Sequence, residues 1–166
     1  MSNEKILVVD LDGTFLKVDS LIESLIWLVR YNFFYFLKII LSTFSLTELK
    51  SKVSASTNYQ DLKCPINQEL VEVITSYRNK GYRIVLATAS HENMAKQIME
   101  AFPFFDEMMA STGCINLKGK YKANALNDKF GQSAFIYAGD SRADIAVWNA
   151  AEQAILINPS RIIKKK

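Results

Sequence analysis

The sequence predicts an α/β protein: a parallel β-sheet covered by helices on both faces, in three layers, with a small helical cap inserted after the first strand. Short β-branched apolar runs alternate with helical patterns over most of the chain, as in folds built from βαβ units. The alternation breaks once, over residues 15–64, which we interpret as the cap. Residues 1–14 and 65–166 then form the core domain, and a chain of 166 residues is long enough for one such core.

The elements of the core domain follow from apolar runs and from the residues that end them. The run KILVVD at 5–10 is apolar, ends in an acid and is typical of a buried strand. A helical pattern over 66–80 ends at Gly81, and a helix over 91–102 ends before Pro103. We further expect strands at 82–87, 105–110, 134–138 and 154–157, helices at 121–130 and 142–151, a short helix opening at 45–48, and a hairpin over 113–120.

The segment 21–41, LIESLIWLVRYNFFYFLKIIL, has the length of a membrane span but contains Glu23, Arg30 and Lys38. A charge near the centre of a bilayer costs about 3 kcal/mol, so we do not expect a spanning helix. The spacing instead favours an amphipathic helix or helix pair, with these charges and Ser24 on one side and aliphatic residues on the other. We expect that aliphatic side to pack on the rest of the domain, and a lipid-facing surface is the alternative.

Composition excludes several classes of protein. A net charge of +3 without a basic stripe argues against nucleic-acid binding. One histidine and two distant cysteines, Cys64 and Cys114, support neither a zinc site nor a disulfide framework. We expect both cysteines to be inert and His91, at a helix start, to be exposed. The N-terminus lacks the pattern of a signal peptide, so we expect a cytoplasmic protein.

Polar side chains follow three of the predicted strands. Asp10 and Asp12 end the first strand, Thr88, Ala89 and Ser90 the second, and Asp140 and Asp144 the fourth, with Lys118 and Lys122 just before it. Because parallel strands present their carboxyl ends at one edge, these groups should converge. Carboxylates that converge repel one another unless a cation lies between them, and oxygen-only ligands favour Mg²⁺. Together with hydroxyls and a lysine, they suit the binding and transfer of a phosphoryl group.

These residues resemble the four ordered motifs of the haloacid dehalogenase (HAD) superfamily. The matches are DLDGT at 10–14, Thr88 at a strand end, a downstream lysine, and GDSRAD at 139–144. The resemblance spans residues 5–157 and implies a HAD-like Rossmannoid fold. An insert directly after DLDGT is similar to the helical cap of the phosphoserine phosphatase-like branch.

The resemblance implies a role for each matching residue. Asp10 is expected to be the nucleophile and a Mg²⁺ ligand. Asp12 is expected to act as general acid and then base, and to bind Mg²⁺ through its backbone carbonyl. Thr88 is expected to bond the phosphoryl group. Asp140 is expected to bind Mg²⁺, with Asp144 a ligand or a partner through water.

The identity of the phosphate-binding lysine stays open between two positions. Lys122, at a helix start with an apolar residue four positions later, fits the family pattern better. Lys118 is the alternative, and we include it with Thr88, Ala89 and Ser90 among the residues expected to contact substrate.

The expected function is therefore a Mg²⁺-dependent phosphatase that hydrolyses a phosphomonoester through an aspartyl-phosphate. A phosphotransferase or phosphomutase of the same fold is one alternative. A non-catalytic, membrane-associated binding module is the other.

A narrower resemblance concerns LATAS at 86–90, ASTGCINLKGKYKANAL at 110–126 and YAGDSRADIAVW at 137–148. These segments are similar to the HAD domain found ahead of integral-membrane prenyltransferases. The resemblance implies a small-molecule, sugar or prenyl-linked phosphate as substrate and a membrane prenyltransferase as partner. It also implies peripheral membrane contact through the aromatic cap and the basic cluster Lys164–Lys166.

Overall fold

The computed structural model describes residues 4–112 and 115–157 and contains one five-stranded parallel sheet. The strands are β1 (Ile6–Val9), β2 (Arg83–His91), β3 (Glu107–Ser111), β4 (Ile136–Gly139) and β5 (Gln153–Leu156), in the spatial order β3-β2-β1-β4-β5. All four neighbouring pairs are parallel. The predicted fold class is confirmed.

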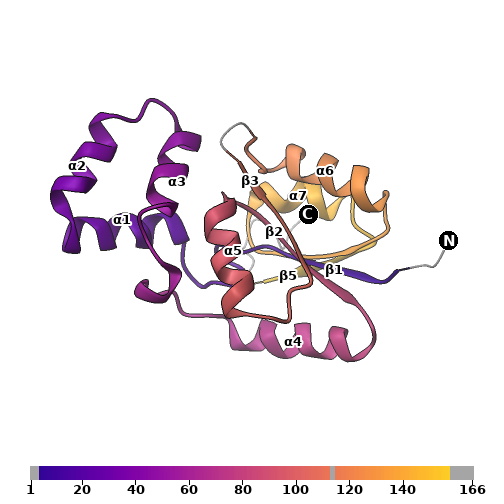
Figure 1. Ribbon diagram of the computed structural model, residues 1–166. Coiled ribbons are helices and arrows are strands. Elements are labelled where there is room, and N and C mark those ends of the chain that lie inside the picture. The colour runs from indigo at the N-terminus through magenta and orange to yellow at the C-terminus, as the bar shows by residue number, and fades with distance from the viewer. Residues whose placement is uncertain (1–3, 113–114, 158–166) are drawn as a thin grey trace.

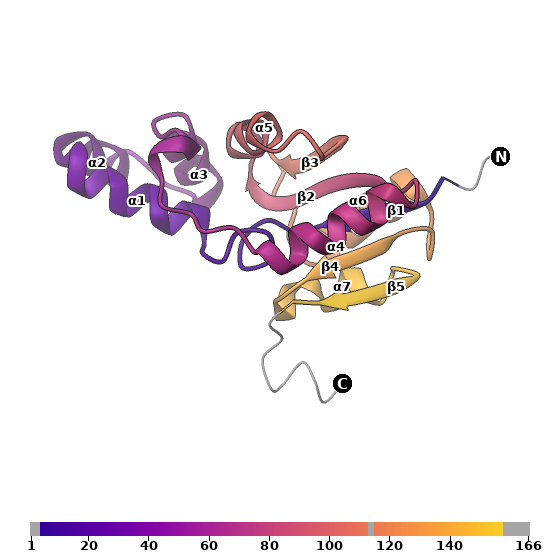
Figure 2. The same ribbon diagram turned by 90° about the horizontal axis from the view of Figure 1, so that it is seen from below.

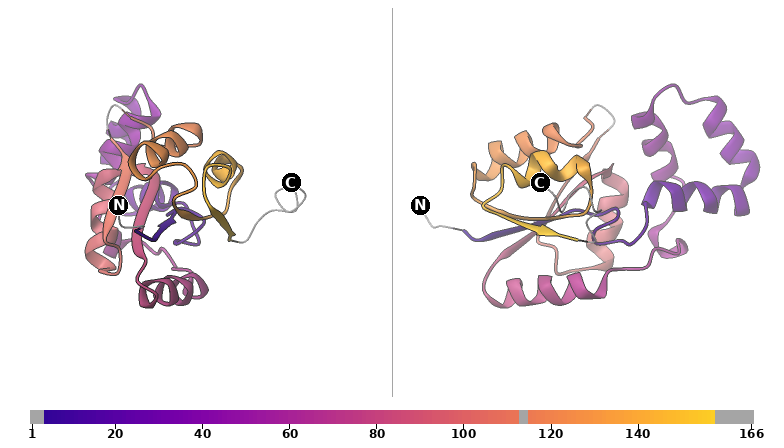
Figure 3. Two further views of the ribbon diagram at one scale, coloured as in Figure 1. Left: turned by 90° about the vertical axis from the view of Figure 1, so that its right-hand side faces the viewer. Right: turned by 180° about the vertical axis from the view of Figure 1, so that it is seen from behind.

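Alternate residues of the central strands supply two apolar cores, because successive side chains of a strand point to opposite faces. Leu7 and Val9 face α4 (Gln68–Asn79) and α5 (Glu92–Ala101). Ile6 and Val8 face α6 (Lys120–Phe130) and α7 (Ile145–Trp148), the second of which follows the short 3-10 helix η2 (Arg142–Asp144). Figure 3 shows these helix pairs on opposite sides of the sheet, which makes the core three-layered.

Three helices between β1 and β2 form a unit that we call the helical insert: α1 (Ser20–Tyr31), α2 (Phe33–Leu41) and α3 (Leu46–Ser54). Asp19 caps α1 by accepting hydrogen bonds from the backbone N–H groups of Leu21 and Ile22. The helical insert lies beyond the carboxyl ends of the strands, with α2 outermost (Figures 1 and 2). A short 3-10 helix, η1 (Tyr59–Asp61), lies on the return to α4. The domain boundaries at residues 15 and 64 stay a prediction.

Helix α1 is oriented differently from the expectation based on its hydropathy pattern, with two serines and Leu28 on its buried side. Ser20 and Ser24 are buried, whereas Ile22 and Ile26 are exposed. The inward hydroxyls are hydrogen-bonded, since Thr57 donates to Ser24 over 3.2 Å and the hydroxyl oxygens of Ser20 and Ser90 lie 3.1 Å apart. Hydrogen bonds of the serines and the burial of Leu28 together hold this helix against its neighbours. The expected burial of its aliphatic side is therefore only partly correct, because Ile22 and Ile26 are exposed.

Several element boundaries also differ from the prediction. Strand β2 continues to His91, with a register irregularity against β3 after Ala87. His91 is buried and caps α5 by accepting from the backbone N–H of Asn93, so its expected exposure is wrong. Helix α7 is shorter than expected. Part of the predicted hairpin, with Cys114, lies outside the described residues, and residues 115–119 contain no strand.

Among the residues that the structure describes, no helix combines the length and the apolar character that crossing a bilayer requires.

Phe15 anchors the chain where it leaves the first motif, and its ring makes edge-on contacts with Phe102, Phe104 and Phe105. The side chain is fully buried. Phe15→Ala should lower the free energy of unfolding by about 3–5 kcal/mol, because it removes this packing and leaves a cavity. Urea denaturation measures the loss. Phe44→Ala, at an exposed position, is the matched control and should change the value by less than about 0.5 kcal/mol; equal effects would contradict the packing described.

Candidate active site

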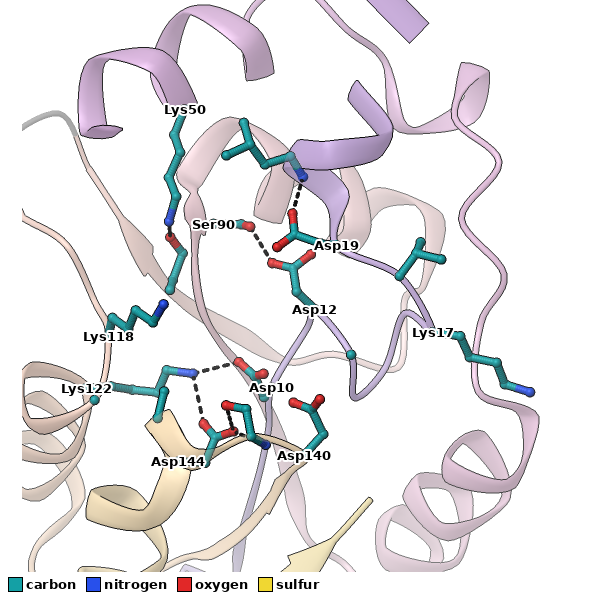
Figure 4. A pocket seen from close by; sticks show the side chains of 17 residues that line it. Asp10, Asp12, Lys17, Asp19, Lys50, Ser90, Lys118, Lys122, Asp140 and Asp144 are labelled. Atoms are coloured by element: carbon teal, nitrogen blue, oxygen red, sulfur yellow. Dashed lines mark hydrogen bonds and ion pairs between the residues drawn. The ribbon is translucent and has the colours of Figure 1, made fainter. Parts of the chain in front are cut away.

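A cavity of ≈ 370 Å³ opens at the carboxyl edge of the sheet, beneath the helical insert. It is lined by the loop after β1, the end of β2, the segment before α6 and the first turn of α6, the segment after β4 with η2, and the helical insert. Figure 4 shows its charged side chains, which are Asp10, Asp12, Lys17, Asp19, Lys50, Lys118, Lys122, Asp140 and Asp144.

Three of these acids form a compact cluster. Carboxylate oxygens of Asp10, Asp140 and Asp144 lie within 4.8 Å of one another. The Lys122 ammonium, itself buried, donates to Asp10 over 2.6 Å and lies 3.7 Å from Asp144. Two of the four charged groups are thus paired directly, and the cluster keeps an excess of negative charge in a buried place.

Tyr137 of β4 connects the lysine to Asp144. Its fully buried hydroxyl accepts a hydrogen bond from Lys122 over 3.0 Å and donates one to Asp144 over 2.7 Å. The other oxygen of Asp144 accepts from the backbone N–H and the hydroxyl of Ser141. Donors on both oxygens fix the orientation of the Asp144 carboxylate.

Burial raises the pKa of two acids of the cluster, Asp10 and Asp140. The pKa of Asp10 rises to about 7, since desolvation and the nearby Asp144 outweigh the attraction of Lys122. Burial and the repulsion of Asp144 also raise the pKa of Asp140. A divalent cation with a preference for oxygen would relieve this repulsion, so the donor set fits such an ion.

Gly13 is required for the close approach of Asp140 to the first motif. Its φ of 77° lies in the left-handed region, and a Cβ atom there would come within 2.3 Å of an Asp140 carboxylate oxygen. Thr14 donates to the other oxygen of Asp140 over 3.3 Å. The motif DLDGT thus positions an acid from β4 as well as its own two.

Asp12 is separate from the acid cluster. Its two oxygens accept from the backbone N–H of Ser20 over 2.7 Å and from the hydroxyl of Ser90 over 2.5 Å. Its pKa is raised by burial, against the effect of these hydrogen bonds. The side chain faces α1 rather than the cluster (Figure 4), so only its backbone carbonyl, as the sequence resemblance implied, stays a predicted metal ligand.

The predicted substrate-binding residues of β2 have different placements. Ala89 and Ser90 line the cavity. Thr88 is fully buried, does not line it, and accepts a hydrogen bond on its hydroxyl oxygen from the backbone N–H of Ser90. Within residues 4–112 and 115–157, the Thr88 hydroxyl donates no hydrogen bond to another side chain or backbone group, and its predicted contact with a phosphoryl group stays a prediction.

Both candidate lysines line the cavity, but only one contacts the acids. Lys122 is buried and bonded to Asp10, whereas Lys118 lies on the segment before α6. The geometry thus favours Lys122 as the partner of Asp10, and a contact of Lys118 with substrate stays a prediction.

The sequence analysis missed several residues that line or support the site, of which Lys50 and Tyr137 make the most specific contacts. Lys50 of α3 lines the cavity and donates to the backbone carbonyl of Ala89 over 2.6 Å; burial lowers its pKa. Nothing in a polar, lysine-rich helix distinguishes this side chain from its neighbours. Tyr137 could have been found, because a tyrosine in an otherwise apolar buried strand needs a partner for its hydroxyl.

Comparisons with known proteins agree with this arrangement. Residues 7–148 match the model of the haloacid dehalogenase-like hydrolase family. The chain belongs to that family. The predicted resemblance to the HAD superfamily is confirmed.

Individual relatives extend the comparison. An uncharacterized protein of Sinorhizobium fredii, y4nM, is 33% identical over 152 residues, which is 91% of this chain and 29% of that protein, so the chain spans under a third of this relative. A HAD family hydrolase of Salmonella enterica serovar Typhi has a TM-score of 0.73 at 13% identity over 98% of this chain and 65% of its own. A phosphoserine phosphatase has a TM-score of 0.68 at 17% identity over 98% and 90%, and a similar structure is a phospho-aspartyl intermediate analogue.

The raised pKa of Asp10 makes a prediction about stability without metal. Its ordinary value is 3.8 and its folded value about 7, so between these values the folded protein binds a proton that the unfolded chain does not hold. The stabilisation from that proton is lost as the pH rises through about 7. The side chain of the Asp10→Asn variant cannot ionise. The melting temperature of this variant, relative to that of the wild type, should therefore be higher at pH 8 than at pH 5.

Thermal unfolding in a chelating buffer measures this difference, and adding Mg²⁺ at pH 8 should shrink it. Asp61→Asn, at an exposed position, should follow the wild type at both pH values. If the melting temperatures of the wild type and of Asp10→Asn changed with pH in the same way, the pKa of Asp10 would not be raised in the folded protein.

Proposed function

We propose that the chain is a Mg²⁺-dependent phosphatase that hydrolyses a phosphomonoester through an aspartyl-phosphate on Asp10. One observation supports this most directly: Asp10 reaches the cavity already paired with Lys122 at 2.6 Å, while Asp12 is held apart from the acid cluster. Asp10 is thus kept beside a cation, whereas Asp12, whose nearest bonded partners are Ser20 and Ser90, is placed where it can hold a proton. Such a separation of roles is what acid–base and nucleophilic catalysis need.

The residues support a two-step mechanism. An oxygen of Asp10 attacks phosphorus while the bond to the leaving alcohol breaks, and Asp12 gives its proton to that alcohol. Water then attacks the aspartyl-phosphate, Asp12 takes a proton from it, and inorganic phosphate and free Asp10 result. The hydrogen bonds from Ser20 and Ser90 would steady Asp12 through both proton transfers. Lys122 would offset the charge that builds up beside Asp10.

The proposed ligands of Mg²⁺ are Asp10, Asp140, Asp144 and the backbone carbonyl of Asp12. The mutual repulsion of the acids and their oxygen-only donors support this choice. When bound, Mg²⁺ would supply positive charge for the phosphoryl oxygens.

The activity test is hydrolysis of an aryl phosphate. The wild type should release phosphate with Mg²⁺ and stop with a chelator. Asp10→Asn should fall to background because the nucleophile is gone, and Asp12→Asn should lose about 10²–10⁴-fold in kcat because proton transfer is lost. Asp61→Asn serves as the control and should match the wild type. Equal rates for Asp10→Asn and wild type would refute the mechanism.

The same experiment separates the alternatives. A phosphotransferase or mutase would pass the phosphoryl group to an added alcohol or sugar in preference to water, so the products are analysed with and without such an acceptor. A non-catalytic binding module would bind inorganic phosphate with Mg²⁺ yet show no turnover.

Lys50 and Lys118 support a substrate that carries a second anionic group beside its phosphate. Both line the cavity, and neither is paired with the acid cluster; Lys50 is bonded to the Ala89 carbonyl. A small-molecule phosphate that also carries a carboxylate, or a sugar that carries two phosphates, fits this description. A prenyl-linked phosphate and a membrane prenyltransferase partner stay predictions based on the sequence resemblance alone.

Lys50→Gln should therefore raise KM about tenfold for phosphomonoesters with a second carboxylate or phosphate, because one charged contact is worth roughly that factor. KM for a plain aryl phosphate should change little. Lys52→Gln is the matched control on the same helix, since Lys52 bonds to Glu48 and Ser42 instead. A uniform effect of Lys50→Gln on both substrates would argue for a structural role.

A further inference from the structure

The outer surface of the helical insert is unusually apolar. Of the fifteen large apolar side chains that are exposed among the described residues, twelve fall between Ile22 and Leu46. They are Ile22, Ile26, Val29, Tyr31, Phe33, Phe34, Tyr35, Leu37, Ile40, Leu41, Phe44 and Leu46, and we call them the outer face. Exposed apolar residues scattered singly are ordinary, but a concentration of this kind marks a surface that is covered by something else.

The orientation of α1 explains how this face arises. The helix holds its serine hydroxyls inward, against Thr57 and Ser90, and turns Ile22 and Ile26 outward. Helices α1–α3 share a small core of their own, in which Leu28, Ile39 and Val53 are buried and other apolar side chains of the insert are partly buried against them. The remaining apolar side chains of α1, Ile22, Ile26 and Val29, stay exposed and can meet a second environment.

The charges of the outer face help to decide what could cover it, a second copy of this chain or a different surface. Residues 22–46 contain two cations, Arg30 and Lys38, which are exposed, and one acid, Glu23, which is only partly exposed. A second copy of this chain would bring like charges together across a shared interface. A surface that is apolar and also carries negative charge would complement both the apolar side chains and the two cations of the outer face.

The composition and position of the face favour a lipid surface. Tyrosine and phenylalanine next to cations are typical of segments that lie in the headgroup region of a bilayer. Helix α2, which carries Phe33, Phe34 and Lys38, is the outermost element of the molecule (Figures 1 and 2), so a flat surface can reach it without meeting the sheet. We propose that the outer face binds peripherally to an anionic bilayer.

Membrane binding through this face would place the cavity close to lipid. Helix α1 contributes residues to the outer face, and its first residue, Ser20, donates a backbone hydrogen bond to Asp12. The proposal does not depend on the phosphatase activity, because binding is measured without substrate.

The experiment is co-sedimentation of the full 166-residue chain with vesicles of phosphatidylglycerol and phosphatidylcholine, compared with phosphatidylcholine alone. The wild type should sediment with the anionic vesicles and about tenfold less with the neutral ones. Phe34→Ser with Phe44→Ser changes residues that are 86% and 94% exposed, so the fold should persist. This variant and Arg30→Glu with Lys38→Glu should each weaken binding to anionic vesicles by at least about tenfold.

Matched controls lie away from the outer face. Tyr121→Ser changes an aromatic residue that is 73% exposed on α6, and Lys63→Glu with Lys80→Glu changes two exposed cations. Both should retain at least half of the binding. Circular dichroism verifies that each variant is folded.

Three results would overturn the proposal. The first is a folded wild type that stays in solution with anionic vesicles. The second is binding that depends only on Lys164–Lys166, seen as loss on removing these residues with no loss in the Phe34 and Phe44 variant. The third is a dimer in solution that this variant converts to a monomer, which would show that a second copy covers the face.

Discussion

The core of the protein brings three carboxylates together beside a single ammonium group at the carboxyl edge of the sheet. Asp10 comes from the end of β1, Asp140 and Asp144 from the segment after β4, and Lys122 from α6. Neighbouring parallel strands bring the acids to one edge. The cost of the arrangement appears in Asp10, whose pKa rises to about 7 despite the bonded lysine. A site that holds uncompensated negative charge suits a cation and a phosphoryl group.

Tyr137 and Gly13 make this crowding possible in different ways. The tyrosine hydroxyl accepts from Lys122 and donates to Asp144, so two groups that could otherwise rotate are fixed by one buried side chain. The glycine leaves space that a Cβ atom would fill against Asp140. Both residues act on the orientation of acids rather than on substrate, and a substitution at either should disturb several acids together.

The sequence was sufficient for the sheet and for the convergence of the acids, because buried strands and the residues at their ends leave strong local patterns. It failed where the outcome depended on tertiary hydrogen bonds. Hydropathy alone predicted that the aliphatic side of α1 faces inward. In the structure Ser20 and Ser24 are buried instead, and their hydroxyls are hydrogen-bonded to those of Ser90 and Thr57. His91 looked exposed because it precedes a helix, but β2 extends through it. Lys50 meets the cavity only through the packing of α3, which no local pattern encodes.

Trapping the phosphorylated enzyme tests the central claim most directly. Asp12→Asn is incubated with an aryl phosphate and Mg²⁺, quenched in acid and analysed by intact-mass and peptide mass spectrometry. The account predicts one phosphoryl group, carried by Asp10, that accumulates because the variant lacks the base for hydrolysis. A phosphoryl group on another residue, or turnover by the wild type with no phosphorylated Asp10 in either protein, would contradict it.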